Sequence, residues 1–431
     1  MPDSVSAEKN LILVAHIMVA RQTDMRPTGC LILMLYNKLP IPNTYCMKKL
    51  SGILGACLIA AGTFSSFGFA AETKSPALTE GCKSAYLMDF DSGECVYKEN
   101  EHARMPIASV CKVMTLTLCF DAVERGELSL DEEVEVSSNA AGMGGSQIFL
   151  ESGYSYPLSQ LVKSIVVCSA NDSCVAVAER VSGSEEQFVA DMNDKAEELG
   201  LSDTLFANCT GLPKDTQYSC AADVAVMFSN LIRHDEYFNF SKIWLEDFEH
   251  GNGRTTSMTN TNKLVRSYNG CDGGKTGFTG EAGYCLASTA KKENMRLVSV
   301  VLGADTSEHR FKSASRLFDY GFANYKNKII LDKTVTLNDN FAVRGGKKRD
   351  FAVLPADDCY MFCKKNDSPE ATFNIVSSDV KAPVEKGQKV GCIEVYKDGV
   401  LYKTVDVVAA ESVKKASYGD RIKEVADGWS L

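Results

Sequence analysis

The order of strand-like and helix-like segments constrains the fold of this chain most. Residues 84–98 alternate apolar and polar side chains around a turn that contains Asp91 and Gly93, which predicts a β-hairpin. Strand-like patterns return at residues 284–289 and 295–302, and apolar residues recur at helical spacing in between. Strands at both ends of a helical segment predict an α/β domain whose terminal strands share one sheet.

The helical middle predicts a layer of buried helices. Apolar residues recur at helical spacing between Val113 and Val123, with Pro106 before this run and Gly126 after it. The predicted helices span residues 109–125, 158–168, 171–181, 185–199, 221–233 and 307–325.

The pattern changes after residue 326. Short alternating runs at residues 333–337, 350–354, 372–376 and 390–396 predict a small all-β domain. The tail then repeats apolar residues at helical spacing, at Tyr418, Ile422, Val425 and Trp429, opposite several lysines and Arg421. This stripe is typical of a helix that lies on a membrane surface, and equally of a short helix that docks on its own protein.

The beginning of the chain contains a targeting signal. Residues 47–70 combine Met47, two lysines, an apolar stretch and small residues before Ala71, which predicts a secretory signal peptide cleaved after Ala70. Its internal position indicates that translation starts at Met47 and that residues 1–46 are an upstream mis-start segment. A membrane-anchored N-terminus and a lipoprotein modified at Cys57 are the alternatives. Export would place the mature protein in the cell envelope or outside the cell.

Composition narrows the possible partners and cofactors. The chain has 46 Lys+Arg and 56 Asp+Glu, and this net charge of −10 argues against nucleic-acid binding. Thirteen of its 16 cysteines follow residue 70, mostly singly within apolar segments, as at Cys119, Cys168 and Cys285. They are expected to be small buried side chains, without a disulfide framework. Cys359 and Cys363 lack the ligand cluster that a zinc site needs, so neither a metal nor another cofactor is expected.

Ser109 and Lys112 form the first motif that can carry chemistry. A spacing of three on a helix places the hydroxyl and the amine on one face, where a neutral lysine can take the serine proton. The apolar run around Lys112 would bury it and lower its pKa. The same S-x-x-K string also begins at Ser6, Ser288, Ser378 and Ser412, so context alone singles out Ser109.

Two further motifs are weak when each stands alone. Ser169 and Asn171 lie between two apolar helices and can point a hydroxyl and an amide into a cleft, although Asn171 also suits a helix N-cap. The K-T-G sequence that starts at Lys275 opens a strand. The glycines of this strand would let a substrate backbone approach the strand closely. Lys275, Thr276 and Thr279 offer hydrogen-bond donors to a carboxylate. A glycine-rich turn with a surface lysine is the alternative.

The three motifs together are far more specific, because S-x-x-K, S-x-N and K-T-G in this order resemble the set shared by class A β-lactamases and penicillin-binding proteins. The sequence resembles the low-molecular-mass penicillin-binding proteins that are serine-type D-alanyl-D-alanine carboxypeptidases. The resemblance extends over residues 84–413 and includes residues 104–109, 144–146, 272–277 and 295–303.

The resemblance implies an α/β transpeptidase/β-lactamase-like catalytic domain, with an antiparallel sheet flanked by helices, followed by a small all-β domain. Together with the N-terminal signal and the apolar stripe of the tail, it divides the chain into a mis-start segment, a signal peptide, a catalytic domain, a β-rich C-terminal domain and an amphipathic tail. Their predicted bounds are 1–46, 47–70, 71–326, 327–411 and 412–431.

The resemblance also implies substrates and residue roles. The substrate would be a peptidoglycan stem peptide ending in D-Ala-D-Ala, and β-lactam antibiotics would acylate the same serine, Ser109. Lys112 would be the base, Ser169 would relay a proton, and the backbone N–H groups of Ser109 and Phe278 would form the oxyanion hole. Phe278 stands where well-known members have His. The predicted substrate-binding residues are Asn171, Lys275, Thr276, Gly277 and Thr279.

Four other functions are alternatives to this interpretation. A class A β-lactamase would have Asp at Ala170 and a deacylating glutamate, whereas Glu185 and Glu186 lie in an ordinary amphipathic helix. A Ser-His-Asp hydrolase is disfavoured because the five histidines are scattered and no G-x-S-x-G elbow is present. A D,D-endopeptidase and an inactive penicillin-binding scaffold remain as alternatives; the intact motifs disfavour the scaffold.

Overall fold

The structure is a computed structural model of the chain, and it describes residues 77–337 and 340–428. The predicted signal peptide at 47–70 and the segment 1–46 lie outside the described residues.

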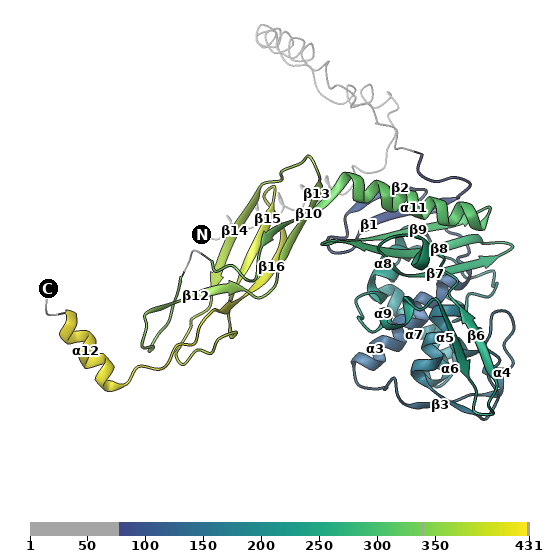
Figure 1. Cartoon of the computed structure of the whole chain (residues 1–431), viewed down its shortest axis with the longest axis horizontal. Helices are drawn as coiled ribbons and strands as arrows, with labels where there is room; N and C mark the ends of the chain where they lie inside the picture. The colour runs from purple at the N-terminus through teal and green to yellow at the C-terminus, as the bar shows by residue number, and fades with distance from the viewer. Residues whose placement is uncertain (1–76, 338–339, 429–431) are drawn as a thin grey trace, which may run out of the picture. The chain divides into compact units, whose positions relative to one another are not determined.

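A five-stranded antiparallel sheet organises the α/β part, in the order β2-β1-β9-β8-β7. Strands from the two ends of this part are direct neighbours, since Ala85 of β1 pairs with Val301 of β9. The predicted sharing of one sheet is therefore confirmed (Figure 1). The strands are β1 (Ser84–Asp89), β2 (Cys95–Glu99), β7 (Cys271–Thr279), β8 (Gly283–Lys292) and β9 (Met295–Ala304).

Helices cover both faces of this sheet (Figure 1). Helix α11 (Ser307–Asn324) packs on one face, where Leu297 and Val301 of β9 meet Leu317. Alternate residues of the same strand, such as Val300, face the larger helical layer. That layer contains α3 (Lys112–Glu124), α5 (Leu158–Cys168), α6 (Asn171–Ser182), α7 (Glu185–Glu198) and α8 (Ala221–Leu231).

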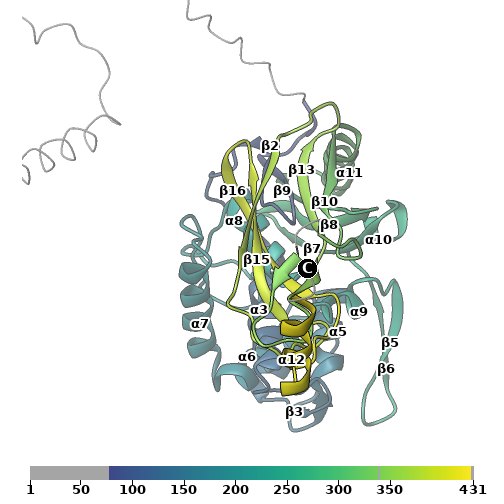
Figure 2. The same cartoon turned by 90° about the vertical axis from the view of Figure 1, so that its left-hand side faces the viewer.

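Shorter elements complete the helical layer. The 3-10 turn η1 (Ala108–Cys111) leads directly into α3, so the predicted helix at 109–125 begins as a 3-10 turn. The structure also contains the hairpin of β5 (Leu245–Glu249) and β6 (Thr255–Thr259), which the sequence analysis missed. Figure 2 shows this hairpin and α7 at opposite edges of the layer. The remaining elements are β3 (Glu133–Glu135), α4 (Ser138–Ala141), β4 (Ser155–Pro157), α9 (Tyr237–Ser241) and α10 (Leu264–Ser267).

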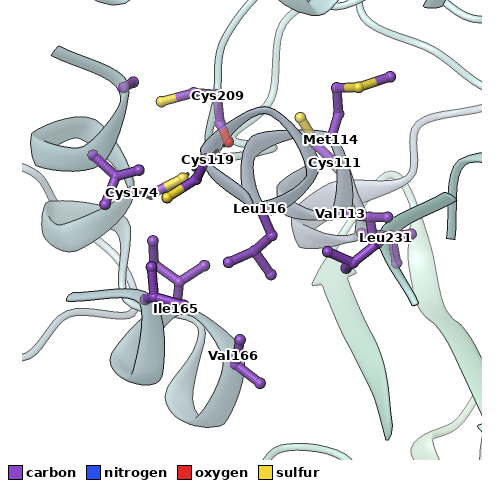
Figure 3. Packing of buried hydrophobic residues seen from close by; sticks show 14 of the residues in the cluster. Cys111, Val113, Met114, Leu116, Cys119, Ile165, Val166, Cys174, Cys209 and Leu231 are labelled. Atoms are coloured by element: carbon purple, nitrogen blue, oxygen red, sulfur yellow. Dashed lines mark hydrogen bonds between the residues drawn. The ribbon is translucent and has the colours of Figure 1, made fainter. Parts of the chain in front are cut away.

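Buried thiols fill part of this core. Cys111, Cys119, Cys174 and Cys209 pack among apolar side chains of the helical layer (Figure 3). The described cysteines carry free thiols, and most of them are buried, as predicted, although Cys95 is exposed. Burial raises the pKa of the Cys119 thiol to about 12, which makes it unreactive near neutral pH.

The β-rich part has its own core, which includes Val353, Met361, Val395 and Val407. Its main sheet has the order β11-β12-β16-β15-β14, and β10 pairs with β13. The strand predicted at 333–337 was wrong: the Asp332 carboxylate accepts a hydrogen bond from the Thr334 amide and closes a turn there. The strands are β10 (Tyr325–Leu331), β11 (Asn340–Ala342), β12 (Asp350–Pro355), β13 (Cys359–Lys364), β14 (Ala371–Ser377), β15 (Lys389–Lys397) and β16 (Val400–Ala409).

The tail forms the predicted helix, α12 (Tyr418–Gly428). Tyr418, Ile422 and Val425 on this helix are exposed. Val413, just before it, is buried in the core of the β-rich part. Among the described helices, none combines the length and the apolar character needed to cross a membrane.

Candidate active site

Ser109 and Lys112 contact each other, as the sequence predicted. Ser109 lies in η1 and is partly exposed, and Lys112 begins α3. The Lys112 Nζ atom lies 3.0 Å from the Ser109 Oγ atom, within hydrogen-bonding distance. At this distance a general base can take a proton from a serine nucleophile.

The Lys112 amine is fully buried and has two further partners. Its Nζ atom donates to the Asn171 side-chain oxygen at 2.7 Å and to the Thr210 carbonyl at 2.6 Å. Burial lowers the pKa of Lys112 below its ordinary value, because a charged amine is poorly solvated in this core. The two fixed acceptors orient the amine, and its lowered pKa makes the neutral, basic form accessible.

Ser169 occupies a strained turn between α5 and α6. Its φ angle of 65° is in the left-handed region, which non-glycine residues seldom adopt. Lys275 of β7 donates a hydrogen bond of 2.8 Å from its Nζ atom to the Ser169 hydroxyl. The turn therefore joins the S-x-N motif to the K-T-G motif through a direct contact.

Lys275 is also buried. Burial, followed by repulsion from Lys112, lowers the pKa of Lys275 well below its ordinary value. A carboxylate bound at Lys275 would favour its charged form. The site thus contains two lysines with different surroundings, one beside Ser109 and one beside Ser169.

Two glycines let separate segments close around Ser109. A Cβ atom on Gly277 would lie 2.6 Å from the Ile107 carbonyl and 3.0 Å from the Ser109 amide nitrogen. Gly211 has φ +80°, and a Cβ atom there would lie 2.0 Å from the Ala108 carbonyl. Strand β7 and the segment around Gly211 can therefore lie directly against η1 only because both positions lack side chains.

Asn171 links the site to a neighbouring loop. Its side-chain amide donates to the Gly144 carbonyl at 2.7 Å, and its backbone N–H donates to the Ser146 carbonyl at 2.7 Å. Asn171 is the first residue of α6, and the N-cap position belongs to Ala170. The N-cap interpretation of Asn171 was therefore wrong, because Asn171 lies inside the helix and its side chain is hydrogen-bonded to the Gly144 carbonyl and the Lys112 amine.

Several supporting residues escaped the sequence analysis. The Asp172 carboxylate accepts hydrogen bonds from the Ile148 and Leu150 amides at 3.1 and 3.0 Å and so fixes the loop that follows Ser146. Asn208 accepts hydrogen bonds from the Thr210 and Gly211 amides, which orients the Thr210 carbonyl toward Lys112. A single sequence offers no sign of these contacts, although Asp172 directly follows the S-x-N motif.

Arg310 is a further residue that the sequence analysis missed. From α11, its Nη1 atom donates to the carbonyls of Gly277 and Cys285, each at 3.3 Å, and its buried Nε atom has no hydrogen-bond partner. Burial lowers the pKa of Arg310 to about 10. The Arg310 guanidinium therefore lies against the backbone of the K-T-G strand.

Two groups of described residues have side chains that could bind a metal, but a lysine or an arginine already forms an ion pair with an aspartate in each group. Asp121 and Glu124 contact His234, and Lys195 lies 3.1 Å from Asp121. Asp203, in the group with His102 and Cys220, pairs with Arg104 at 2.9 Å. These groups are explained as ion pairs.

Two protein-family models match this chain. Residues 70–306 match the family model described as D-alanyl-D-alanine carboxypeptidase, and residues 325–415 match the model described as penicillin-binding protein 5, C-terminal domain. The chain belongs to the D-alanyl-D-alanine carboxypeptidase family. The predicted family, fold class and serine-type carboxypeptidase activity are thereby confirmed.

The chain matches two curated relatives over most of their length and most of its own. DacF from Bacillus subtilis is 35% identical over 394 residues, covering 89% of this chain and 99% of the relative. DacC from Escherichia coli is 30% identical over 387 residues, covering 84% and 93%. Both are named D-alanyl-D-alanine carboxypeptidases.

Solved structures agree with the fold. The peptidoglycan synthesis regulatory factor PBP3 from Streptococcus pneumoniae has a TM-score of 0.67 at 26% identity, covering 78% of this chain and 100% of that chain. Penicillin-binding protein 5 from Haemophilus influenzae has a TM-score of 0.60 at 28% identity, covering 78% and 98%.

The end of β7 is where this carboxypeptidase departs from the expected family pattern. Phe278 is 55% exposed, and its ring stacks on Tyr284 with centroids 4.3 Å apart.

The two threonines of this strand have different surroundings. Thr276 is buried, and the Thr279 hydroxyl accepts a hydrogen bond of 3.0 Å from the Ala282 amide. The Thr279 hydroxyl thus also stabilises the turn to β8.

Proposed function

We propose that this carboxypeptidase is exported and removes the terminal D-alanine from peptidoglycan stem peptides through an acyl-enzyme on Ser109. The contact of 3.0 Å between the Lys112 amine and the Ser109 hydroxyl carries the proposal, together with the burial of that amine. A neutral Lys112 accepts the Ser109 proton while the Ser109 oxygen attacks the penultimate D-Ala carbonyl.

The first half-reaction ends when the peptide bond breaks. The backbone N–H groups of Ser109 and Phe278 hold the negative oxygen of the tetrahedral intermediate. Ser169, in contact with Lys275, passes the proton that Lys112 took from Ser109 to the nitrogen of the leaving D-alanine, and Lys112 becomes neutral again. Because Phe278 contributes its backbone here, the change from His to Phe leaves this donor in place.

The remaining motif residues position the substrate. Lys275 binds the terminal carboxylate with Thr276 and Thr279, while Gly277 admits the peptide backbone beside β7. Asn171 holds the amide on the other side of the scissile bond. After D-alanine leaves, a water molecule gives a proton to Lys112 and attacks the carbonyl carbon of the Ser109 ester. The bond between that carbon and the Ser109 oxygen breaks, the proton passes from Lys112 to the Ser109 oxygen, and the shortened peptide leaves. The role of the enzyme would be cell-wall maturation.

The decisive experiment is intact-mass spectrometry of the chain from Ala71 after incubation with penicillin, with Ser109→Ala beside it. We expect one penicilloyl adduct on the parent and none on the variant, followed by release of D-alanine from a D-Ala-D-Ala peptide by the parent alone. Folded parent protein that forms no adduct would refute this mechanism.

Digestion of purified peptidoglycan separates carboxypeptidase from endopeptidase activity. A carboxypeptidase shortens stem peptides and leaves dimeric muropeptides intact, whereas an endopeptidase resolves the dimers. Loss of dimers would show that the chain also cuts cross-links.

A further inference from the structure

Strand β14 (Ala371–Ser377) lies at an open edge of the main sheet of the β-rich part (Figure 1). In the sheet order β11-β12-β16-β15-β14, its neighbour is β15, and no other described strand pairs with it. The opposite edge, β11, has only three residues. An open edge carries backbone N–H and C=O groups that can pair with a strand of another chain. Of the two edges, β14 therefore offers the longer template for adding a strand to this sheet.

The register with β15 shows which backbone groups of β14 point outward. In an antiparallel pair, hydrogen-bonded and non-hydrogen-bonded residues alternate along each strand. Just before β14, the Glu370 carbonyl accepts a hydrogen bond from the Asp398 amide, and just after it, the Ser378 amide donates to the Val390 carbonyl. The even-numbered residues of β14 therefore bond to β15. The odd-numbered residues direct their N–H and C=O groups away from β15; these are Ala371, Phe373, Ile375 and Ser377.

This edge lacks the features that usually prevent strand addition. Proteins protect exposed edges with lysine, with proline or with a β-bulge. None of the seven residues of β14 is charged or a proline, and the register with β15 is regular along the whole strand. Phe373 and Val376 are 47% and 43% exposed. The strand thus combines outward backbone groups with apolar side chains that are only partly buried.

The sequence of β14 is complementary to a second copy of itself. An antiparallel pair centred on Asn374 would use all seven residues of both strands. It places Phe373 of one copy opposite Ile375 of the other, and Thr372 then lies opposite Val376. Aromatic and β-branched side chains are favourable cross-strand neighbours. Because the strand is uncharged, no like charges oppose each other along it, although the chain has a net charge of −10.

We propose that two copies of this chain associate through β14, which joins their main sheets into one continuous antiparallel sheet. The Phe373 amide of one copy donates to the Ile375 carbonyl of the other, and the Ile375 amide donates to the Phe373 carbonyl in return. The two-fold axis passes beside Asn374, where the strands form a non-hydrogen-bonded pair. One pair of strands buries little area, so we expect association in the micromolar range. The proposal does not depend on the chemistry at Ser109.

Sedimentation velocity of the chain from Ala71 tests the association across the micromolar concentration range. The sedimentation coefficient of the parent should rise from that of a monomer to that of a dimer. Phe373→Pro removes one outward N–H from each copy, and so two hydrogen bonds from the dimer, while the bonds to β15 remain. It should raise the dimer dissociation constant by about tenfold or more. Phe373→Ala keeps the N–H and should raise the constant less.

The exposed apolar side chains of α12 offer a second route to association, and a tail variant separates the two routes. Ile422→Glu with Val425→Glu should dimerise like the parent, because neither residue belongs to β14. A parent that remains monomeric across the concentration range would overturn the proposal. So would a dimer that Phe373→Pro does not weaken.

Asn374→Cys provides a test that does not require the strand to tolerate proline. The Cα atoms of a non-hydrogen-bonded antiparallel pair are about 4.5 Å apart, which a disulfide can span. With oxidised glutathione, the two introduced thiols should form a disulfide across the two-fold axis, and the glutathione is reduced to two thiols.

The control for cross-linking is Val400→Cys, because Val400 is 70% exposed but lies on β16. Non-reducing electrophoresis should show a covalent dimer for Asn374→Cys, and none for the parent or for Val400→Cys. If the covalent dimer forms no faster with Asn374→Cys than with Val400→Cys, the pairing of two β14 strands is wrong.

Discussion

Lys112 is the residue on which the proposed chemistry depends most. Its amine forms hydrogen bonds with Ser109, Asn171 and Thr210, which come from three separate parts of the chain. Replacing Lys112 by Met keeps most of the buried side-chain volume but removes the base. We expect penicillin acylation of Ser109 to slow by at least about a hundredfold, as is usual when a general base is lost.

The rate at which the penicilloyl adduct forms on Ser109 is measured by intact-mass spectrometry. The exposed Lys242→Met is the control, and it should acylate like the parent. Acylation of Lys112→Met at the parent rate would rule out Lys112 as the base.

The pH dependence of acylation follows from the same lysine. Only the neutral amine can accept the Ser109 proton, so the rate should rise with pH as Lys112 loses its own proton. Because burial lowers the pKa of Lys112 below its ordinary value of 10.5, the rise should be complete at a lower pH than for an exposed lysine. Stopped-flow acylation rates across the pH range measure this, and a midpoint at or above 10.5 would contradict it.

At the scale of elements, the site depends on the close approach of β7 to η1. A Cβ atom on Gly277 would lie only 2.6 Å from the Ile107 carbonyl, so Gly277→Ala must push the strand and the turn apart. We expect a loss of about 1–3 kcal/mol in the free energy of unfolding, as for overpacked interiors, together with slower acylation.

Gly280→Ala is the matched control, since no atom lies within 4 Å of the corresponding Cβ position. Denaturant unfolding and acylation rates should distinguish the two variants. Equal behaviour of both would show that the contact between β7 and η1 tolerates a side chain.

The elements themselves were largely predictable. The hairpin at 84–98, the strands after residue 283 and the main helices follow from apolar periodicity, because each element buries one face or more. The β5–β6 hairpin was missed because little more than Phe248 and Met258 is buried there, which leaves no clear alternation. The segment 333–337 has an alternating pattern, yet local hydrogen bonds at Asp332 favour a turn.

At the scale of the whole molecule, the tail has exposed apolar side chains, and membrane binding by them stays a prediction. Ile422 and Val425 on α12 are 55% and 58% exposed. We expect Ile422→Glu with Val425→Glu to weaken binding to anionic vesicles by about tenfold or more, because insertion of apolar side chains into the interface is lost. Vesicle co-sedimentation measures this.

Val400→Glu is the control, since Val400 is equally apolar and 70% exposed but lies on β16. It should bind vesicles like the parent. If the α12 variant also binds like the parent, α12 is not a membrane anchor. Substitutions are preferable to deletion from residue 412, because Val413 is buried in the β-rich part.

The sequence by itself determined the family, the α/β class, the all-β part and the three motifs, since motif order and apolar periodicity are local properties. Only the tertiary structure decided which groups surround the motifs. The Thr210 carbonyl, the Gly144 carbonyl and the Arg310 guanidinium come from loops and a distant helix. Backbone carbonyls have no residue signature, and the burial that lowers the pKa values of Lys112 and Lys275 exists only once the sheet and helices have packed around them.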